Sequence, residues 1–510
     1  MGIPSYFKTL TQSVNGCIVK QPSQPAAYLL LDFNCIIYGC LRNMPAYSSL
    51  TRAAWEAKLI HEVCEAVTVI WKAAGEPANL FIAVDGVVPM AKIKQQRMRR
   101  FKSVWMSAQE IRYGVRSADT EEWDKNAITP GTAFMEALNL QLISLGRKHG
   151  WTVSTSAEPG EGEHKVMAFL RGGGVTEEGS VLIYGLDADL IVLTMLTSSM
   201  YLKSERNPCY LMREKTEFGT FHGFEEAIWL FLSEAHLRRA ICGSQTNNDF
   251  IVNYVAVMSI LGNDFLPTSL TVKIRDGGHE RILRLLQEFY ERGERFVVNG
   301  VCQWGTFQRL CQRLAADEAS CLVAAVTRKS QIKHPAARTE NEAKMIPVQT
   351  LPLTWFAEEE FYSGSELKEG WQNIYERHVP QAESVREWKY GIQWILDYYL
   401  GKPVNLFWFY PWHLAPLWCW LAADISSVES SWCLDVNERP LKEQEQLALV
   451  LPLESWWLIR DPRLRQAPVR YPSLWPSAFG FSSLGKWWMW ECEADIPILL
   501  PGYLRSLSAT

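Results

Sequence analysis

Three short apolar runs in the first half of the chain each lead to an aspartate. The runs occupy residues 28–32, 80–85 and 181–186. In open α/β sheets, ligands bind outside the carboxyl ends of the strands. One aspartate at such a position would be interpreted as a cap for the following turn, but three of them indicate a shared site. These residues are Asp32, Asp85 and Asp187.

Four further acids occur in similar settings. Glu161 and Glu163 flank a glycine at the start of a helical run, and glycine frees the backbone so that both side chains can enter one site. Asp189 follows Asp187 by two residues, a spacing that puts both carboxylates on one side of an extended backbone. Asp264 comes after the apolar stretch 250–261, where we expect a helix to end in a loop.

The chemistry of seven clustered carboxylates is metal binding. They would raise one another's pKa and would stay ionised only if cations neutralised them. Oxygen-only ligands select Mg²⁺ or Mn²⁺ over zinc. Two such ions about 4 Å apart can activate a water and stabilise the leaving oxygen of a phosphodiester. We therefore expect a two-magnesium centre, with Mn²⁺ as an alternative, in which all seven acids are catalytic residues and metal ligands.

A basic segment directly follows the run that ends in Asp85. Residues 90–102 contain six basic residues and no acid. Three of the basic residues and one glutamine share one helical face, which can bind a phosphate through charge-assisted hydrogen bonds. An ordinary solvated face is the alternative, but the neighbouring carboxylates favour phosphate binding. The four residues are Lys92, Gln96, Arg99 and Arg100.

The elements that position these residues follow from the hydrophobic pattern. Each apolar run is followed by a segment of helical periodicity, which is typical of an α/β fold with a parallel sheet. Residues 327–350 are polar and mixed in charge, as expected of a linker. The region 351–510 is rich in Trp, of which the chain has 22. We expect most of these in a packed core and a minority in base stacking.

Composition limits the classes of function. The 510 residues are 48% hydrophobic and 21% charged, as in a folded chain with a large core. Because the net charge is −5, positive charge for a nucleic acid must be local. The 12 cysteines include no CxxC pair, which indicates reduced thiols in the cytoplasm rather than a zinc site. The apolar stretch 406–423 contains two prolines and is not expected to span a membrane.

Six separated strings resemble, in order, those of the XRN family of 5′→3′ exoribonucleases. They occupy residues 31–34, 84–101, 128–132, 159–165, 184–191 and 261–267. The opening residues 1–4 are also similar, and residues 408–416 resemble a string of the family's second region. One string would be a weak signal, but six in order are highly specific and span most of the chain.

The resemblance implies a processive 5′→3′ exoribonuclease that degrades single-stranded RNA with a 5′-monophosphate to mononucleotides, in cytoplasmic RNA decay and mRNA turnover. It implies a Rossmann-like nuclease core at 1–326, related to flap endonucleases and PIN domains. A linker at 327–350 and a second region at 351–510, packed on the core, would follow. The seven acids would be the metal ligands, and the basic face of 90–102 would be the 5′-phosphate pocket.

The chain also departs from the family pattern. Tyr38 stands where the family usually has a histidine that stacks on the first base. Trp408 is the expected stacking partner, and Leu406 occupies the position of a neighbouring family Trp. Met90 replaces a usual arginine. The long C-terminal extensions of the family are missing, so the chain resembles a minimal member.

Two other functions stay open at this point. A flap-type, structure-specific DNA nuclease would use the same core. A catalytically retired RNA-binding scaffold would keep the fold without the chemistry, although the presence of all seven acids argues against it. Flap DNA substrates and a test of magnesium dependence distinguish these alternatives.

Overall fold

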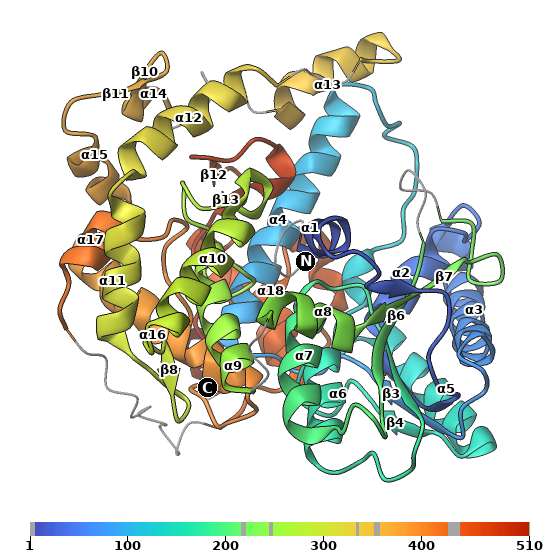
Figure 1. The fold of residues 1–510 in the computed structure, drawn as a ribbon. Coiled ribbons are helices and arrows are strands. Elements are labelled where there is room, and N and C mark those ends of the chain that lie inside the picture. The colour runs from blue at the N-terminus through green and yellow to red at the C-terminus, as the bar shows by residue number, and fades with distance from the viewer. Residues whose placement is uncertain are drawn as a thin grey trace.

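The computed structural model describes residues 6–215, 221–243, 248–332, 336–350, 358–426 and 439–508. The opening string at 1–4 lies outside this part of the chain. The central sheet and its helices occupy one side of the molecule, and further helices build the other side (Figure 1).

Seven strands form the central sheet, in the order β1-β7-β6-β5-β2-β3-β4. Strands β4, β3, β2, β5 and β6 are parallel, which confirms the prediction from alternating strands and helices. At one edge, β7 and β1 are antiparallel to their neighbours. Antiparallel strands need no crossover helix, so the alternating pattern did not predict them. The bounds are Ile18–Val19 (β1), Ala26–Asp32 (β2), Asn79–Ala83 (β3), Thr152–Ser154 (β4), Ser180–Tyr184 (β5), Cys209–Glu214 (β6) and Trp229–Ser233 (β7).

Alternate residues of the strands face two separate hydrophobic cores. Leu29 and Leu31 of β2 belong to the core that includes α3 and α5, whereas Tyr28 and Leu30 belong to the core that includes α6, α7 and α9. Because both faces are covered, the strands are apolar throughout. The helices concerned are α2 (Asn34–Leu41), α3 (Arg52–Ala73), α5 (Ala133–His149), α6 (Gly162–Arg171), α7 (Asp189–Tyr201), α8 (Glu234–Cys242) and α9 (Asn248–Met258).

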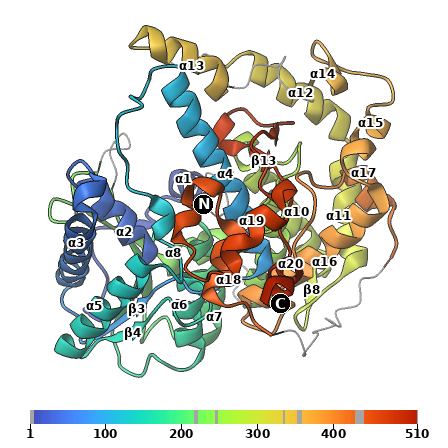
Figure 2. The same ribbon diagram turned by 180° about the vertical axis from the view of Figure 1, so that it is seen from behind.

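Helix α4 (Met90–Arg112) confirms the predicted basic helix and runs through the middle of the molecule. Lys94 Nζ donates a hydrogen bond to the carbonyl oxygen of Tyr410 at 2.7 Å, and Arg97 donates to the carbonyls of Leu449 and Pro497 at 3.0 and 3.1 Å. Both side chains are buried. Lys102 Nζ donates to the carbonyl oxygen of Trp490 at 2.6 Å. Three of the six basic residues therefore bind the C-terminal region, which lies over α4 when the molecule is seen from behind (Figure 2).

The second region is mainly helical, with two small hairpins. Buried Trp388, Trp394 and Trp418 confirm that many of its Trp side chains pack in the core. Its elements are α14 (Glu358–Phe361), β10 (Tyr362–Ser363), β11 (Glu366–Leu367), α15 (Trp371–His378), α16 (Gln381–Tyr399), α17 (Trp418–Ala423), α18 (Glu443–Val450), α19 (Ala467–Arg470), β12 (Gly480–Ser482), β13 (Glu493–Asp495) and α20 (Pro501–Ser508).

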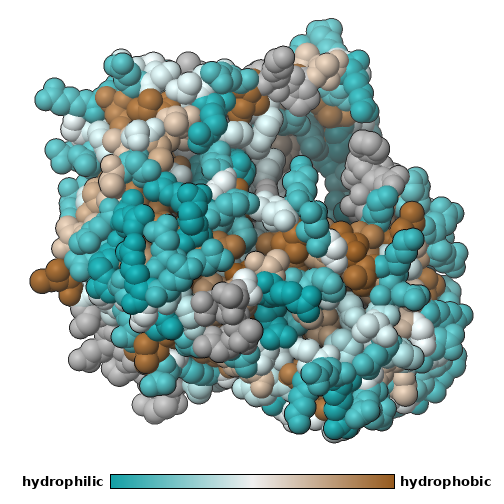
Figure 3. Space-filling view, in the orientation of Figure 1, coloured by the Kyte–Doolittle hydropathy of each residue, from teal (hydrophilic) through white to brown (hydrophobic). Residues whose placement is uncertain are grey.

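Helices occupy much of the stretch that was expected to be a linker. Helix α12 (Glu318–Ser330) and helix α13 (Glu340–Thr350) arch over the top of the molecule (Figure 1). Asn341 Nδ2 donates to the carbonyl oxygen of Gly114 at 3.0 Å, so α13 rests on the end of α4. Between this arch and the part that holds the sheet, the surface is hollowed (Figure 3). The remaining elements are α1 (Tyr6–Ser13), α10 (Gly278–Glu291), β8 (Val297–Val298), β9 (Val301–Cys302) and α11 (Trp304–Ala315).

The apolar stretch 406–423 forms loops and the short helix α17, with Trp418 and Trp420 buried. Among the helices of the described ranges, none has both the length and the apolar character needed to cross a membrane. In this stretch, His413 Nδ1 lies 2.8 Å from Glu493 Oε2, a contact that joins the stretch to β13.

Candidate active site

The carboxyl edge of the sheet brings three of the predicted aspartates together. Asp32 ends β2, Asp85 follows β3, and Asp187 follows β5. These three strands are direct neighbours in the sheet. Asp85 accepts hydrogen bonds from the backbone N–H of Gly162 at 2.6 Å and from Asn34 Nδ2 at 2.8 Å, which orient its carboxylate.

Gly162, the first residue of α6, lies against these carboxylates. A Cβ atom at this position would be 2.6 Å from Asp32 Oδ1 and 2.7 Å from the carbonyl oxygen of Ala83. The left-handed backbone conformation in this segment belongs to Gly160, with φ of 109°. The backbone freedom expected of the glycines around Glu161 is thus used at Gly160, whereas the glycine at 162 is required for space.

Helix starts position three of the other acids. Glu161 is the N-cap residue of α6, Glu163 lies in its first turn, and Asp189 is the first residue of α7. Ala188 has φ −70° and ψ −29°, so the expectation of an extended backbone across 187–189 was wrong. The positive end of the helix dipole favours a carboxylate at such a position, which explains why the helix begins there.

Lys92 of α4 connects the edge of the sheet with the seventh acid. Its Nζ lies 2.6 Å from Glu161 Oε2 and 2.7 Å from Asp264 Oδ2. Burial alone would lower the pKa of Lys92, but Asp264 and Glu161 outweigh burial and raise it. In return, Lys92 holds the pKa of Asp264 below its ordinary value in spite of burial. Lys92 was expected in the phosphate pocket, and the structure places its ammonium group between two acids.

The acids concentrate negative charge at this site. Burial raises the pKa of Asp32, and the carboxylates of Asp85 and Asp187 raise it further. Burial, followed by the charge of Asp264, raises the pKa of Asp189 to about 7. Shifts of this direction mean that the ionised acids repel one another and that added positive charge would stabilise them.

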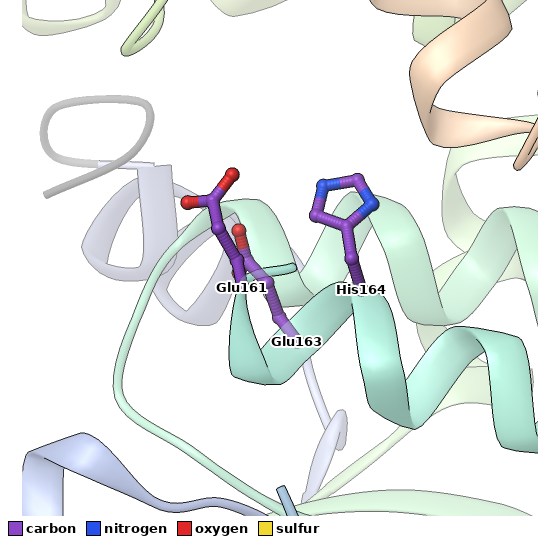
Figure 4. A group of neighbouring side chains, drawn as sticks. All are labelled: Glu161, Glu163 and His164. Carbon is purple, nitrogen blue, oxygen red and sulfur yellow. The ribbon is translucent and has the colours of Figure 1, made fainter. Parts of the chain in front are cut away.

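The donor atoms at the start of α6 fit a divalent cation. Glu161, Glu163 and His164 each offer a ligand atom, and these atoms lie within 4.8 Å of one another (Figure 4). Glu163 Oε2 and His164 Nε2 are buried without a hydrogen-bond partner among the described residues. Burial lowers the pKa of His164 to about 3, so its ring is neutral and able to ligate. Tyr398 packs against this ring in a tilted arrangement, with 3.9 Å between centroids, and its hydroxyl donates to Glu161 Oε1 at 3.1 Å.

The other predicted phosphate-binding residues lie on two flanks of α4. With about 100° between successive residues, Gln96 and Arg100 lie to one side of Lys92 and Arg99 to the other. Burial lowers the pKa of Arg100 to about 10, and Tyr38 lies close enough to Arg100 to interact with it electrostatically. Arg100 Nη1 is buried and lacks a hydrogen-bond partner within the described ranges. A guanidinium with a buried, unused donor fits a phosphate group.

Residues 1–207 match the family described as the XRN 5′-3′ exonuclease N-terminus. The chain belongs to this XRN family.

Two of the relatives of this XRN protein align with nearly its whole length, and a third aligns with half of it. It is 24% identical to 5′-3′ exoribonuclease 2 of Arabidopsis thaliana, over 98% of this chain and 66% of the relative. It is 25% identical to human 5′-3′ exoribonuclease 1, over 98% of this chain and 33% of the relative. For 5′-3′ exoribonuclease 2 of Schizosaccharomyces pombe the identity is 30%, over 50% of this chain and 31% of the relative. The chain thus spans less than two thirds of the length of these relatives.

The two residues expected to stack on a base have different surroundings in this XRN protein. Tyr38 is 41% exposed. Trp408 is 8% exposed, packs against Tyr390 and Trp394, and donates from Nε1 to Glu387 at 3.0 Å. Its ring is thus enclosed by protein, and its stacking role stays a prediction.

Sequence reasoning gave no role to three residues that contact the acids. Asn34 and His164 lie within strings that resemble the XRN family, so their presence in those strings was an available signal. Tyr398, at the end of α16, had no signal, because only the folded chain brings it to the acids.

Proposed function

We propose that this XRN protein is a processive, magnesium-dependent 5′→3′ exoribonuclease. Its substrate would be single-stranded RNA with a 5′-monophosphate, and its products mononucleotides. The main support is the gathering of the seven acids at the carboxyl edge of the sheet and at the helix starts beside it, where Glu161, Glu163 and Asp189 are buried and Lys92 of α4 contacts Glu161 and Asp264. The names of the relatives as 5′-3′ exoribonucleases agree with this activity.

The predicted metal ligands would hold two Mg²⁺ ions, with Mn²⁺ as an alternative. When bound, such ions generate a hydroxide nucleophile and stabilise the leaving oxygen. The carboxylates neutralise the ions and fix their positions, and Tyr398 and Asn34 orient two of the carboxylates through hydrogen bonds. The ligands are Asp32, Asp85, Glu161, Glu163, Asp187, Asp189 and Asp264, to which His164 is added.

The residues of α4 would hold the end of the strand. Arg100 and Gln96 would bind the terminal phosphate on one flank, and Arg99 would add positive charge on the other. Lys92 would remain with the acids and stabilise negative charge that develops at the scissile phosphate. Tyr38 would stack on the first base, with Trp408 as the predicted partner.

We also propose the fold relationship, the domain bounds, the location and the cellular role that the family resemblance implies. The fold would be related to flap endonucleases and PIN domains, with a nuclease core at 1–326 and a second region at 351–510 packed on it. The protein would act in the cytoplasm, in RNA decay and mRNA turnover.

The test uses one RNA sequence with 5′-monophosphate, 5′-triphosphate and 5′-hydroxyl ends, a matched DNA, and a flap DNA. We expect release of mononucleotides from the monophosphate RNA and complete loss of activity in EDTA. The other two ends should be degraded at least roughly tenfold more slowly: the 5′-hydroxyl end lacks charge-assisted hydrogen bonds that are worth about 1.5–3 kcal/mol each, and the triphosphate is larger than the proposed pocket.

Each alternative has its own result. Equal degradation of the three RNA ends would refute the phosphate pocket. Cleavage of flap DNA but not of linear RNA would identify a flap-type nuclease. RNA binding without magnesium-dependent turnover would identify a scaffold.

A further inference from the structure

A cavity of about 550 Å³ lies along one flank of α4, next to the acids. Gln95, Arg99 and Lys102 of α4 form one wall, and Asp264 lies at its edge. The segments 273–275 and 486–493 form the opposite wall. The volume is in the range of small-molecule sites in proteins. The cavity therefore has room for a ligand and opens beside the predicted reaction centre.

The unpaired charge of the cavity is positive. Its three acids already have partners: Asp264 contacts Lys92, Glu491 contacts Arg275, and Glu493 contacts His413. In contrast, the charged groups of Arg99 and Lys486 make no hydrogen bond or ion pair with the residues that the structure describes. Two available cations in a cavity whose acids are neutralised favour an anionic ligand.

Three Trp side chains line the same cavity: Trp487, Trp488 and Trp490. Arg275 covers the ring of Trp487, with Cζ 4.2 Å from its centroid. The side chain of Trp490 is 56% exposed, and Lys102 Nζ fixes its backbone by donating to its carbonyl oxygen at 2.6 Å. Cations interleaved with exposed aromatic rings are typical of single-stranded nucleic acid sites, because bases stack on the rings while cations bind the phosphates.

The position of the cavity relative to the acids gives a direction along the strand. Arg100 and Tyr38, proposed to hold the 5′ end, lie on one flank of α4. Lys92 and the acids lie at the centre, and the cavity lies on the other flank. A strand whose first nucleotide is on the Arg100 flank and whose first phosphodiester is at the acids meets the cavity beside Asp264, which lines it. From Lys92 to Lys102, α4 provides about 15 Å for this path.

We infer that this cavity is a subsite for RNA nucleotides on the 3′ side of the scissile phosphodiester. Lys486 binds a phosphate there, Arg99 adds positive charge between this subsite and the proposed 5′-phosphate pocket, and Trp490 stacks on a base. This inference rests on the proposed exoribonuclease function and extends it, since it assigns a binding role to the C-terminal Trp segment.

The test compares the wild-type chain with a Trp490→Ala/Lys486→Ala double variant. Trp490 is exposed and Lys486 is half-buried, so the variant is expected to fold, which a thermal melt verifies. The main readout is the ratio of kcat/KM for a 5′-monophosphorylated octamer to that for the dinucleotide. We expect this ratio to fall by about 5- to 100-fold, the effect of one lost stacked base.

A second readout needs no turnover. The affinity for a 3′-labelled octamer is measured by fluorescence anisotropy in EDTA at several salt concentrations. The double variant should bind more weakly, and the slope of log affinity against log salt should decrease by about 0.7 for one lost phosphate contact. The control variant Trp457→Ala/Lys58→Ala removes an exposed Trp and an exposed Lys that do not line the cavity, and it should match the wild type.

The outcomes separate the two proposals. If the double variant keeps the length ratio and the octamer affinity of the wild type, the subsite is refuted even when RNA is degraded. If the wild type degrades no RNA, the proposed function fails, and the anisotropy measurement alone decides whether the cavity binds a strand.

Discussion

Replacing Gly162 with alanine would insert a methyl group among the acids. The new Cβ would be 2.6 Å from Asp32 Oδ1 and 2.7 Å from the carbonyl oxygen of Ala83, whereas ordinary contacts begin at 3.4 Å. The Asp32 side chain can rotate away, but the Ala83 oxygen belongs to the backbone of β3. The start of α6 must therefore shift by about 0.7 Å, and Glu161 and Glu163 must shift with it.

A shift of this size affects activity more than folding. Overpacking of this kind costs about 1–3 kcal/mol of stability. A displacement of reacting groups by about 1 Å can cost about 100-fold in rate. We therefore expect Gly162→Ala to remain folded in a thermal melt and to lose about 100-fold in hydrolysis of 5′-monophosphorylated RNA.

A matched variant separates the effect of crowding from that of the substitution itself. Gly480 has no heavy atom within 4 Å of its ideal Cβ position, so Gly480→Ala should keep wild-type activity. Activity of Gly162→Ala within threefold of the wild type would refute the reasoning, because it would mean that the spacing between α6 and the strand ends does not matter for the reaction.

Three further predictions follow from the electrostatics. Lys92→Met removes the ammonium group between Glu161 and Asp264 and should destabilise the protein by about 3–5 kcal/mol in EDTA. Mg²⁺ should restore part of this stability. Equal melting temperatures of the variant and the wild type in EDTA would contradict the pairing of Lys92 with these acids. Burial and a neighbouring carboxylate raise the pKa of Asp189 to about 7, so Mg²⁺ competes with a proton there. The affinity for Mg²⁺, measured by calorimetry, should therefore fall by up to about tenfold between pH 8 and pH 6. An affinity for Mg²⁺ that does not change with pH would contradict this. Burial lowers the pKa of His413, but hydrogen bonds to two carboxylates outweigh burial and raise this pKa above 6.5. The stability lost in His413→Phe should therefore be greatest below pH 6.5 and should shrink as the pH rises through the pKa of His413 in the folded protein. Denaturant titrations at pH 6 and pH 8.5 measure this difference, and a larger loss at the higher pH would be inconsistent with it.

The parts of the fold that follow from local pattern were predictable. The strand ends at Asp32, Asp85 and Asp187 were visible because strands buried on both faces need continuous apolar runs. The helix that carries Lys92 was visible because basic residues recurred at helical spacing. Glu161 could be placed at a helix start for the same local reasons.

The rest depends on contacts between distant parts of the chain. The pairing of Lys92 with Asp264 joins residues 172 positions apart, and nothing in the local spacing distinguishes a lysine that faces phosphate from one that faces acids. The burial of Trp408 likewise depends on α16, whose Tyr390 and Trp394 enclose its ring. The cavity arises only where the C-terminal segment 486–493 packs beside α4.

The central claim is that the converging acids bind divalent cations, and anomalous diffraction from crystals soaked in Mn²⁺ tests it most directly. We expect two anomalous peaks within coordination distance of carboxylate oxygens, bounded by Asp32, Glu163, Asp189 and Asp264. Crystals that show no anomalous peak among these acids, in a Mn²⁺ concentration at which the protein degrades RNA in solution, would contradict the account.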